Sequence, residues 1–291
     1  MRKGDVGVQG KLRADVNGVS KVHCCLWSSN GCPIERPTKS GPARHLSAEP
    51  ESDECLEIGG LPLDGRVAIV TGADGGLGKS VTQALLDVGA IVVGTSRKIQ
   101  ASQFDHPSIN AIPADVSTKE GAAGLIDQVL SRFGKLQVLV HTVGGFAGGQ
   151  AIVDTEDDTF QRMMELNLKP LLHMLRAAIP PLRESGAGCV IAVGSRAAVE
   201  PGPTLGAYSA SKAAMLSVMK TVALENRDAG LRANVILPGT IDTPANRRAN
   251  PDADYSKWVQ PAAIASLITW LAGDAGRDIN GAAIPIYGSE I

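Results

Sequence analysis

The sequence has few aromatic residues, almost no net charge and no long hydrophobic run. Phe, Trp and Tyr make up 3% of the 291 residues, and 28 Lys+Arg against 30 Asp+Glu give a formal net charge of −2. No 18 consecutive residues are apolar, so we expect neither a membrane-spanning helix nor a membrane partner. The charge balance argues against a nucleic-acid partner, because proteins that bind nucleic acids usually carry a clustered basic face. Glycine is abundant, with 33 residues, as in a soluble α/β domain.

Residues 1–60 differ in composition from the rest of the chain. Their apolar residues follow neither a period of 2 nor one of 3.6, and their acidic and basic residues are balanced, so we expect a poorly ordered extension. No apolar run of a secretory signal follows the basic start, and we therefore expect a cytoplasmic protein. Four cysteines lie here without the spacing of a zinc site, so no metal is expected: Cys24, Cys25, Cys32 and Cys55. Cys189, in an apolar run, is expected to be buried.

Residues 61–291 alternate between buried-strand and helical patterns, which predicts one domain. Apolar, β-branched runs predict strands at 66–70, 90–95, 109–114, 136–141, 188–194, 231–237 and 282–287. Helical spacing of apolar residues predicts helices at 76–88, 119–133, 155–182, 204–227 and 261–271, the third capped by Thr155. Strands that are apolar throughout and separated by helices indicate an α/β fold with a doubly wound parallel sheet, Rossmann-like in architecture.

A glycine-rich loop follows the first expected strand and opens the first helix. Its pattern, T-G-x-x-x-G-x-G, allows a tight turn and a close approach of the backbone to a pyrophosphate, which the helix N-terminus would attract. The loop predicts a dinucleotide-binding site. The residues expected to bind the cofactor are Thr71, Gly72, Asp74, Gly76, Leu77 and Gly78.

The end of the second strand indicates which cofactor is used. An acidic residue there would bind the ribose 2′-hydroxyl of NAD, but this chain has Ser96 and Arg97. The small Ser96 leaves room, and the Arg97 guanidinium can form charge-assisted hydrogen bonds with a 2′-phosphate. We therefore expect NADP(H) to be favoured over NAD(H). Asp115 and Val116, after the third strand, are expected beside the adenine.

Four polar residues form a candidate catalytic set. Tyr208 and Lys212 are four residues apart in an expected helix and so share one face, where the ammonium would lower the pKa of the phenol toward working pH. Tyr208 is thus a candidate general acid and base. Ser195 ends the fifth strand and could bind a substrate carbonyl oxygen. Asn167 is expected mid-helix among apolar residues, where an asparagine is unfavourable unless its side-chain amide serves a function.

Together these motifs resemble the short-chain dehydrogenase/reductase superfamily over residues 64–291. The glycine loop matches its cofactor loop, and Asn167, Ser195, Tyr208 and Lys212 match its catalytic tetrad. The resemblance implies that Tyr208 donates the proton, Ser195 steadies the carbonyl oxygen and Lys212 also binds the nicotinamide ribose, while Asn167 holds a water in a proton relay. It further assigns cofactor contacts to Val143, Gly144, Pro238, Gly239 and Thr240.

One segment departs from the family pattern. Where the family has Asn-Asn-Ala-Gly after the fourth strand, this chain reads His141-Thr142-Val143-Gly144. A structural hydrogen-bonding role is expected for His141 rather than acid–base chemistry.

Two loop regions resemble the dihydropteridine reductase branch of the superfamily. The first is 144–149 and the second comprises 237–247 and 251–258; residues 144–151 and 240–258 should form the substrate lip. Their Phe146, Tyr255 and Trp258 could line a flat pocket or simply cover the cofactor. That branch typically lacks the catalytic serine and uses NADH, whereas this chain has Ser195 and no acidic residue at Ser96 or Arg97, so the branch's substrate is not carried over in full. The leading hypothesis is hydride transfer from NADPH to a carbonyl or quinonoid small molecule, with a dihydropteridine-like substrate as one option. A 3-oxoacyl-[acyl-carrier-protein] reductase, a general carbonyl or alcohol dehydrogenase, and a non-catalytic NADP-sensing regulator are the alternatives.

Self-association is expected because the resemblance implies that two long helices pack against their copies, giving a homodimer or homotetramer. The residues expected on that surface are Met163, Met164, Leu171, Leu172, Met174, Leu175, Met215, Leu216 and Met219. Half of them could equally be ordinary core.

Overall fold

A seven-stranded parallel sheet forms the centre of the protein, in the order β3-β2-β1-β4-β5-β6-β7. The computed structural model describes residues 63–104, 106 and 108–289; the extension expected at 1–60 lies outside them. The strands are β1 Val67–Thr71, β2 Ile91–Thr95, β3 Ile109–Ala111, β4 Val138–His141, β5 Cys189–Val193, β6 Arg232–Pro238 and β7 Ala283–Ile286. The expected doubly wound α/β architecture is confirmed.

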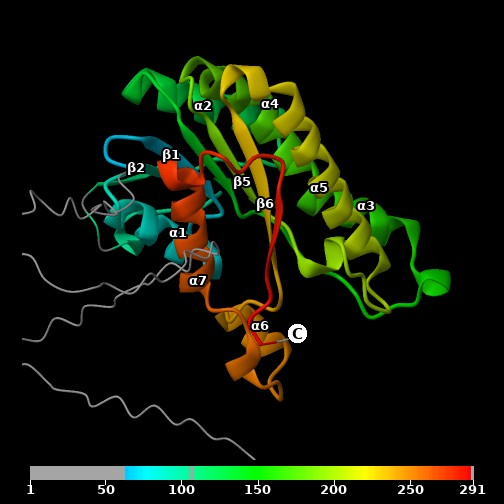
Figure 1. Ribbon diagram of the computed structural model, residues 1–291. Coiled ribbons are helices and arrows are strands. Elements are labelled where there is room, and N and C mark those ends of the chain that lie inside the picture. Colours follow the sequence, from blue (N-terminus) through cyan, green and yellow to red (C-terminus); the bar gives the residue numbers. More distant parts are fainter. Residues whose placement is uncertain (1–62, 105, 107, 290–291) are drawn as a thin grey trace, which may run out of the picture. The chain divides into compact units, whose positions relative to one another are not determined.

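Helices cover both faces of the sheet (Figure 1). They are α1 Gly76–Asp87, α2 Lys119–Phe133, α3 Asp157–Asn167, α4 Lys169–Glu184, α5 Gly206–Glu225, α6 Pro244–Ala249 and α7 Pro261–Ala272. Short 3-10 helices are η1 Ala101–Gln103, η2 Ile152–Asp154, η3 Arg196–Ala198, η4 Arg227–Ala229, η5 Tyr255–Lys257 and η6 Asp274–Gly276. One apolar core joins the sheet to α2, α4 and α5, and the other joins it to α1 and α7. Among the described residues, no helix has the length and apolarity to cross a membrane.

The central strands are buried on both faces, which explains their unbroken apolar sequences. Successive residues of β1 alternate between the two cores, with Ile69 in one and Val70 in the other. Cys189 is fully buried in β5, as expected of a small apolar side chain. Thr71 and His141 are buried polar residues at the carboxyl ends of β1 and β4, where the sheet opens toward the loops.

The expected helix over 155–182 is in fact two helices. α3 ends at Asn167, Leu168 has φ −103° and ψ −46°, and α4 begins at Lys169 with a proline in its first turn. Pro170 has no N–H to continue the hydrogen-bond ladder, and its ring crowds the carbonyl four residues before it. Asn167 is therefore the last residue of α3 rather than a mid-helix residue. Thr155 does not cap α3 either: Glu156 holds that position, and the Thr155 hydroxyl donates to the Ala151 oxygen.

The apolar surface expected on the long helices is mostly core. Six of the nine residues named for it have exposed fractions of 3% or less: Met163, Leu171, Met174, Leu175, Met215 and Met219. Five of these pack in the core between the sheet and helices α2, α4 and α5. The prediction rested on the number of apolar residues in the helices, and the area of the sheet that these helices cover does not follow from local sequence.

Candidate active site

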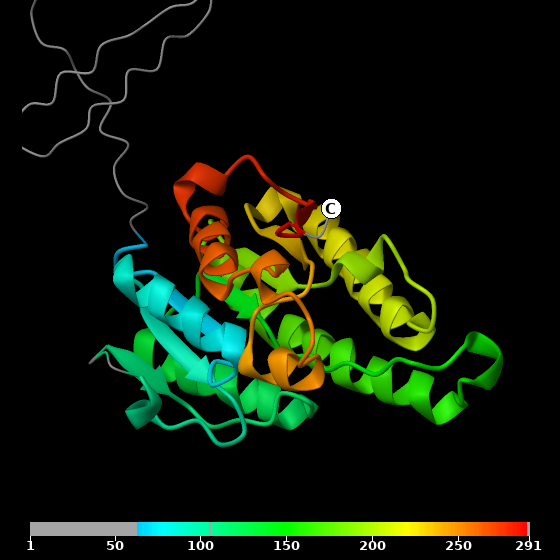
Figure 2. The ribbon, with the colours of Figure 1, turned by 90° about the horizontal axis from the view of Figure 1, so that it is seen from below.

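The candidate site lies along the carboxyl ends of the strands; Figure 2 views the ribbon from below, the side on which α6 follows β6. The chain first adds β2 and β3 on one side of β1, then returns to place β4 on its other side. Loops after β1 and β4 consequently diverge, and a crevice at such a switch point is the usual ligand site of this architecture. The loops after β1, β2, β4, β5 and β6 carry most of the site residues expected from the sequence.

The glycine loop after β1 is shaped for close backbone contact. Gly72 has φ +68°, and a Cβ there would lie 2.9 Å from the Thr142 Oγ1. A Cβ on Gly78 would come within 2.0 Å of the Gly72 carbonyl oxygen, so only glycine lets α1 pack this closely on the loop. No side chain caps α1, which leaves the N–H groups of its first turn to a ligand. This cradle fits a dinucleotide pyrophosphate.

A polar pocket of about 460 Å³ adjoins the loop, lined by Asp74, Ser96, Arg97 and Lys98. The Ser96 hydroxyl donates to the Asp74 Oδ2 over 2.7 Å, and the Lys98 N–H donates to the Ser96 Oγ over 3.3 Å. The sequence predicted Asp74, Ser96 and Arg97 at the cofactor but missed Lys98, and it missed that the Asp74 carboxylate shares a pocket with the Arg97 guanidinium. The two lie 23 residues apart, and no local pattern connects them.

A second pocket of about 260 Å³ continues from the first and contains the residues expected at the adenine. Asp115 lies there with its pKa held below the usual range, chiefly by hydrogen bonds from the Ser117 hydroxyl and N–H. Sequence reasoning missed several of the lining residues because the break after α3 was not foreseen. The pocket is lined by Gly72, Thr95, Ser96, Arg97, Ala114, Asp115, Val116, Ser117, Val143, Glu165, Leu166 and Pro170.

Ser195 and Tyr208 line the same cavity, and the Ser195 side chain favours the ionised form of the Tyr208 phenol. Ser195 follows β5 and begins η3, and its Oγ accepts from the Ala197 N–H over 3.2 Å. The pKa of Tyr208 is raised, because burial disfavours the phenolate more than the Ser195 side chain favours it. The lowering expected from Lys212 is therefore not the dominant effect.

Lys212 lies one turn after Tyr208, but its ammonium points to the main chain. The Nζ donates to the Val193 oxygen over 3.1 Å, and 5% of the residue is exposed. Burial lowers the pKa of Lys212 to about 8, so the side chain is mostly charged at neutral pH. One of its three N–H donors is engaged with Val193, which leaves donors for a ligand.

Asn167 ties the loop after β4 to helix α5. Its Oδ1 accepts from the Gly145 N–H over 2.8 Å, and its Nδ2 donates to the Ser211 Oγ over 2.9 Å. A Cβ on Gly144 would lie 2.9 Å from the Asn167 Oδ1 and 3.1 Å from the Lys212 Nζ, so the loop needs glycine there. The Asn167 side chain is thus a positioning group, and the water-holding role stays a prediction.

His141 is buried beneath this loop and joins the ends of β1 and β4. Its Nδ1 lies 3.0 Å from the Thr71 Oγ1, which also accepts from the Thr142 N–H over 3.3 Å. Burial, with a smaller effect of the Lys212 charge, lowers the pKa of His141 to about 3, so the imidazole is neutral. The structure confirms the hydrogen-bonding role expected for His141.

A cavity of about 600 Å³ opens beside Ser195 and Tyr208. The exposed ring of Phe146 stands edge-on to the Tyr208 ring, with centroids 5.0 Å apart, and so supplies an aromatic wall. Tyr255 and Trp258, expected at the lip, contact each other instead and do not line this cavity. The lining residues are Phe146, Gly194, Ser195, Arg196, Ala197, Glu200, Gly202, Leu205, Tyr208, Pro238, Gly239, Thr240, Ile241, Asn246, Ala249 and Asn250.

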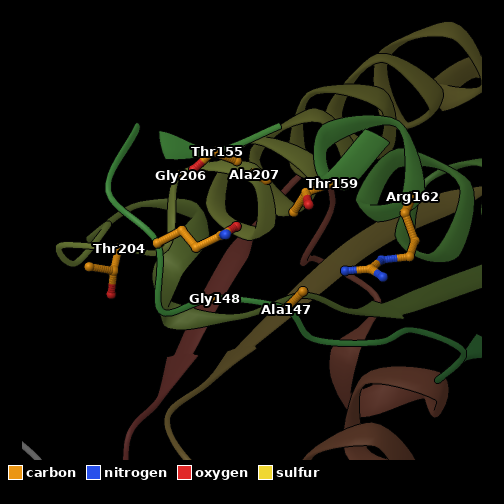
Figure 3. Close-up of a pocket in the computed structure, with 9 residues that line it drawn as sticks. Ala147, Gly148, Thr155, Thr159, Arg162, Thr204, Gly206 and Ala207 are labelled. Carbon is orange, nitrogen blue, oxygen red and sulfur yellow. The ribbon is translucent and has the colours of Figure 1, made fainter. Parts of the chain in front are cut away.

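A smaller pocket of about 70 Å³ lies between the loop after β4, helix α3 and the start of α5 (Figure 3). Arg162 and Thr159 extend toward it from α3. Thr204, at its rim, has φ +62°, and its carbonyl oxygen accepts from the Gly149 N–H over 3.0 Å. This bond joins the two loops that lead into the candidate active site.

Comparisons with known proteins agree with this geometry. A family model described as short chain dehydrogenase matches residues 66–254. An uncharacterized oxidoreductase of Staphylococcus haemolyticus is 31% identical, covering 72% of this chain and 91% of that protein. A 4-formylbenzenesulfonate dehydrogenase of Comamonas testosteroni is 29% identical over 79% of this chain and 99% of that protein. The 3-ketoacyl-(acyl-carrier-protein) reductase of Brucella melitensis, solved with NADH, has a TM-score of 0.70 at 27% identity, covering 78% of this chain and 99% of that one.

Proposed function

Because the chain belongs to the short-chain dehydrogenase family and is an NAD(P)-dependent oxidoreductase, we propose that it transfers a hydride between NADP(H) and a small carbonyl or quinonoid compound. The observation that carries this proposal is that Ser195 and Tyr208 together line a cavity of about 600 Å³, with the buried Lys212 one helical turn after Tyr208. The site residues expected from the sequence are proposed in the same roles, with Asn167 as a positioning group.

The bound nicotinamide would supply the hydride, and the protein residues control the oxygen and its proton. Ser195 and Tyr208 line the same cavity, so both hydroxyls can bind the carbonyl oxygen of a substrate held there. Tyr208, kept protonated by its raised pKa, donates its proton to that oxygen during reduction. The Lys212 Nζ lies beside the loop at Gly144, and its remaining N–H donors would hold the cofactor ribose.

The preference for NADP(H) is the finer part of the proposal. Arg97 and Lys98 line the pocket beside the glycine loop, and no ion pair of theirs is found within the described part of the chain. Two unpaired cations favour a 2′-phosphate over a hydroxyl. Replacing Arg97 by Gln should therefore weaken NADPH binding more than NADH binding.

The decisive experiment is NADPH oxidation by the purified protein with a panel of acceptors. The panel contains a quinonoid dihydropterin, a β-ketoacyl thioester, a quinone, an aromatic aldehyde and simple ketones. Tyr208→Phe, which deletes only the acidic hydroxyl, should reduce kcat by about 100-fold or more while cofactor affinity changes less than twofold. A variant that retains more than a tenth of kcat would refute Tyr208 as the proton donor.

Two other activities are tested by the same panel. The resemblance to the 3-ketoacyl-(acyl-carrier-protein) reductase favours a β-ketoacyl thioester as the second candidate substrate. The aldehyde is included because a relative is named for 4-formylbenzenesulfonate. If the protein binds NADPH but turns over no acceptor, it acts as a cofactor-sensing regulator instead.

We also propose that the protein forms a homodimer or homotetramer in the cytoplasm. Exposed apolar side chains remain on three helices, with exposed fractions of 44% for Leu166, 65% for Leu224 and 37% for Trp270. Light scattering at micromolar concentration should give a multiple of the 30.2 kDa chain mass. A mass equal to one chain would refute self-association.

A further inference from the structure

We propose that Asp74 is a specificity-determining residue that opposes the 2′-phosphate of NADP(H) and accepts the 2′-hydroxyl of NAD(H). The cofactor preference would then be set by the balance of Asp74 against Arg97, and NAD(H) would remain usable. The inference rests on the proposed function, since it concerns the cofactor of that reaction.

The backbone fixes Asp74 in the pocket of Ser96, Arg97 and Lys98. Thr71 of β1 pairs with Thr95 of β2, so the loops that follow the two strands leave the sheet side by side. The N–H groups of Gly72 and Ala73 both donate to the Thr95 oxygen, over 2.8 and 3.3 Å. The loop that carries Asp74 is therefore attached to the end of β2, and the hydrogen bond from the Ser96 hydroxyl holds the carboxylate in the pocket.

The hydrogen bonds of the pocket suit a hydroxyl better than a phosphate. The Ser96 hydroxyl gives its single proton to the Asp74 Oδ2 over 2.7 Å, so it has none for a phosphate oxygen. No described residue donates a hydrogen bond to the other oxygen of the Asp74 carboxylate. That oxygen can accept a proton from a ribose hydroxyl, as an acidic residue at the end of the second strand does in NAD-binding sites.

The charged groups of the pocket also distinguish a 2′-phosphate from a 2′-hydroxyl. Neither Arg97 nor Lys98 forms an ion pair with Asp74 in the structure, so the carboxylate and the cations remain separate in one space of about 460 Å³. A doubly charged phosphate placed there is attracted by Arg97 and repelled by Asp74. A neutral hydroxyl meets no such repulsion. Removal of the Asp74 charge should therefore help NADP(H) and harm NAD(H).

The test measures the Kd of NADPH and of NADH by direct titration, without any substrate. Asp74→Asn keeps the size of the side chain and an oxygen that accepts from Ser96, but removes the charge. We expect the Kd of NADPH to fall roughly tenfold, because one charge–charge repulsion at a partly exposed site is removed. The Kd of NADH should rise roughly two- to fivefold, because the 2′-hydroxyl loses a charged acceptor. Arg97→Gln should act in the opposite sense on the preference and raise the Kd of NADPH more than that of NADH.

Asp87→Asn is the matched control, because Asp87 is an exposed acid at the far end of α1 that accepts a hydrogen bond from Gln83. It should change neither constant. Asp74→Ser serves as a second variant should Asp74→Asn not fold. If Asp74→Asn or Asp74→Ser changes both Kd values by the same factor, the inference is wrong while the oxidoreductase proposal stands. If the unsubstituted protein binds neither cofactor, both are wrong.

Discussion

The Nζ of Lys212 donates a hydrogen bond to the main-chain oxygen of Val193 over 3.1 Å, in surroundings that leave 5% of the residue exposed. This burial lowers the pKa of Lys212 from 10.5 to about 8. The folded state therefore binds fewer protons than the unfolded state between pH 8 and 10.5, so this group makes stability rise with pH across that window. At neutral pH the protein carries a charged lysine at a cost in folding free energy.

Lys212→Met should stabilise the fold at pH 7 while it abolishes turnover. The pKa shift corresponds to a cost of about 3 kcal/mol in folding free energy for the buried charge, which the substitution removes. The loss of the hydrogen bond to the Val193 oxygen offsets about 1–3 kcal/mol of this gain. We expect a net gain on the order of 1 kcal/mol in urea denaturation at pH 7, shrinking toward pH 10. Lys220→Met, on an exposed position of the same helix, is the control. A loss of stability in Lys212→Met at pH 7 would contradict this account.

His141 should make the protein sensitive to acid. Its pKa is lowered from 6.5 to about 3, so the folded state holds the imidazole neutral while the unfolded state takes up a proton. The stability that depends on the neutral ring is present above pH 6.5 and is lost as the pH falls toward 3. His141→Asn, which keeps a hydrogen-bonding side chain without a titrating group, should flatten the decline of Tm between pH 6.5 and 4. Equal slopes for the two proteins would rule out His141 as the cause.

Gly144→Ala should damage the active site more than the fold. The added Cβ would meet the Asn167 Oδ1 at 2.9 Å and the Lys212 Nζ at 3.1 Å, so the loop or both side chains must move. We expect kcat/KM to fall by about tenfold or more, since small displacements of positioned groups are costly. Gly124→Ala in α2 is the control, because its Cβ would meet no atom within 4 Å and alanine favours a helix. A Gly144→Ala enzyme with unchanged kinetics would show that the loop adapts freely.

Met215→Lys and Leu224→Lys separate the core of α5 from its surface. Met215 is fully buried, so a lysine there should cost several kcal/mol and leave little folded protein. Leu224 is 65% exposed, and its replacement should shift Tm by no more than about 2 °C beyond the loss that weaker self-association causes. Thermal unfolding followed by circular dichroism distinguishes the two. Similar Tm losses in both variants would show that the buried and exposed positions on α5 are wrongly assigned.

The parts of the fold that the sequence predicts well are those coded by local patterns. The apolar runs of β1 and β5 and the helix over Lys119–Phe133 need only neighbouring residues to be recognised. The break at Leu168 was missed because the apolar periodicity continues across it, and only Pro170 signals the interruption. The inward direction of Met215 depends on how much sheet a helix covers, which no local pattern states.

The candidate site likewise combines features that local sequence patterns predict with features that depend on how the strands and helices pack. The glycine loop and the spacing of Tyr208 and Lys212 are visible in sequence, and each is found at the edge of the sheet. The contact between Ser96 and Asp74 is not visible, because it exists only when β1 and β2 pair. The direction of the Tyr208 pKa shift was also missed, since burial raises this pKa more than Ser195 lowers it.

The cavity beside Tyr208 shares no lining residue with either of the two pockets near Arg97. The first is built from the loops after β4, β5 and β6, and the others mainly from those after β1, β2 and β3. A mutation that adapts the enzyme to a new substrate thus need not disturb its choice of coenzyme, and the reverse also holds. Natural selection can act on the two properties separately, so a lineage could exchange one metabolic reductant for another and keep its chemistry.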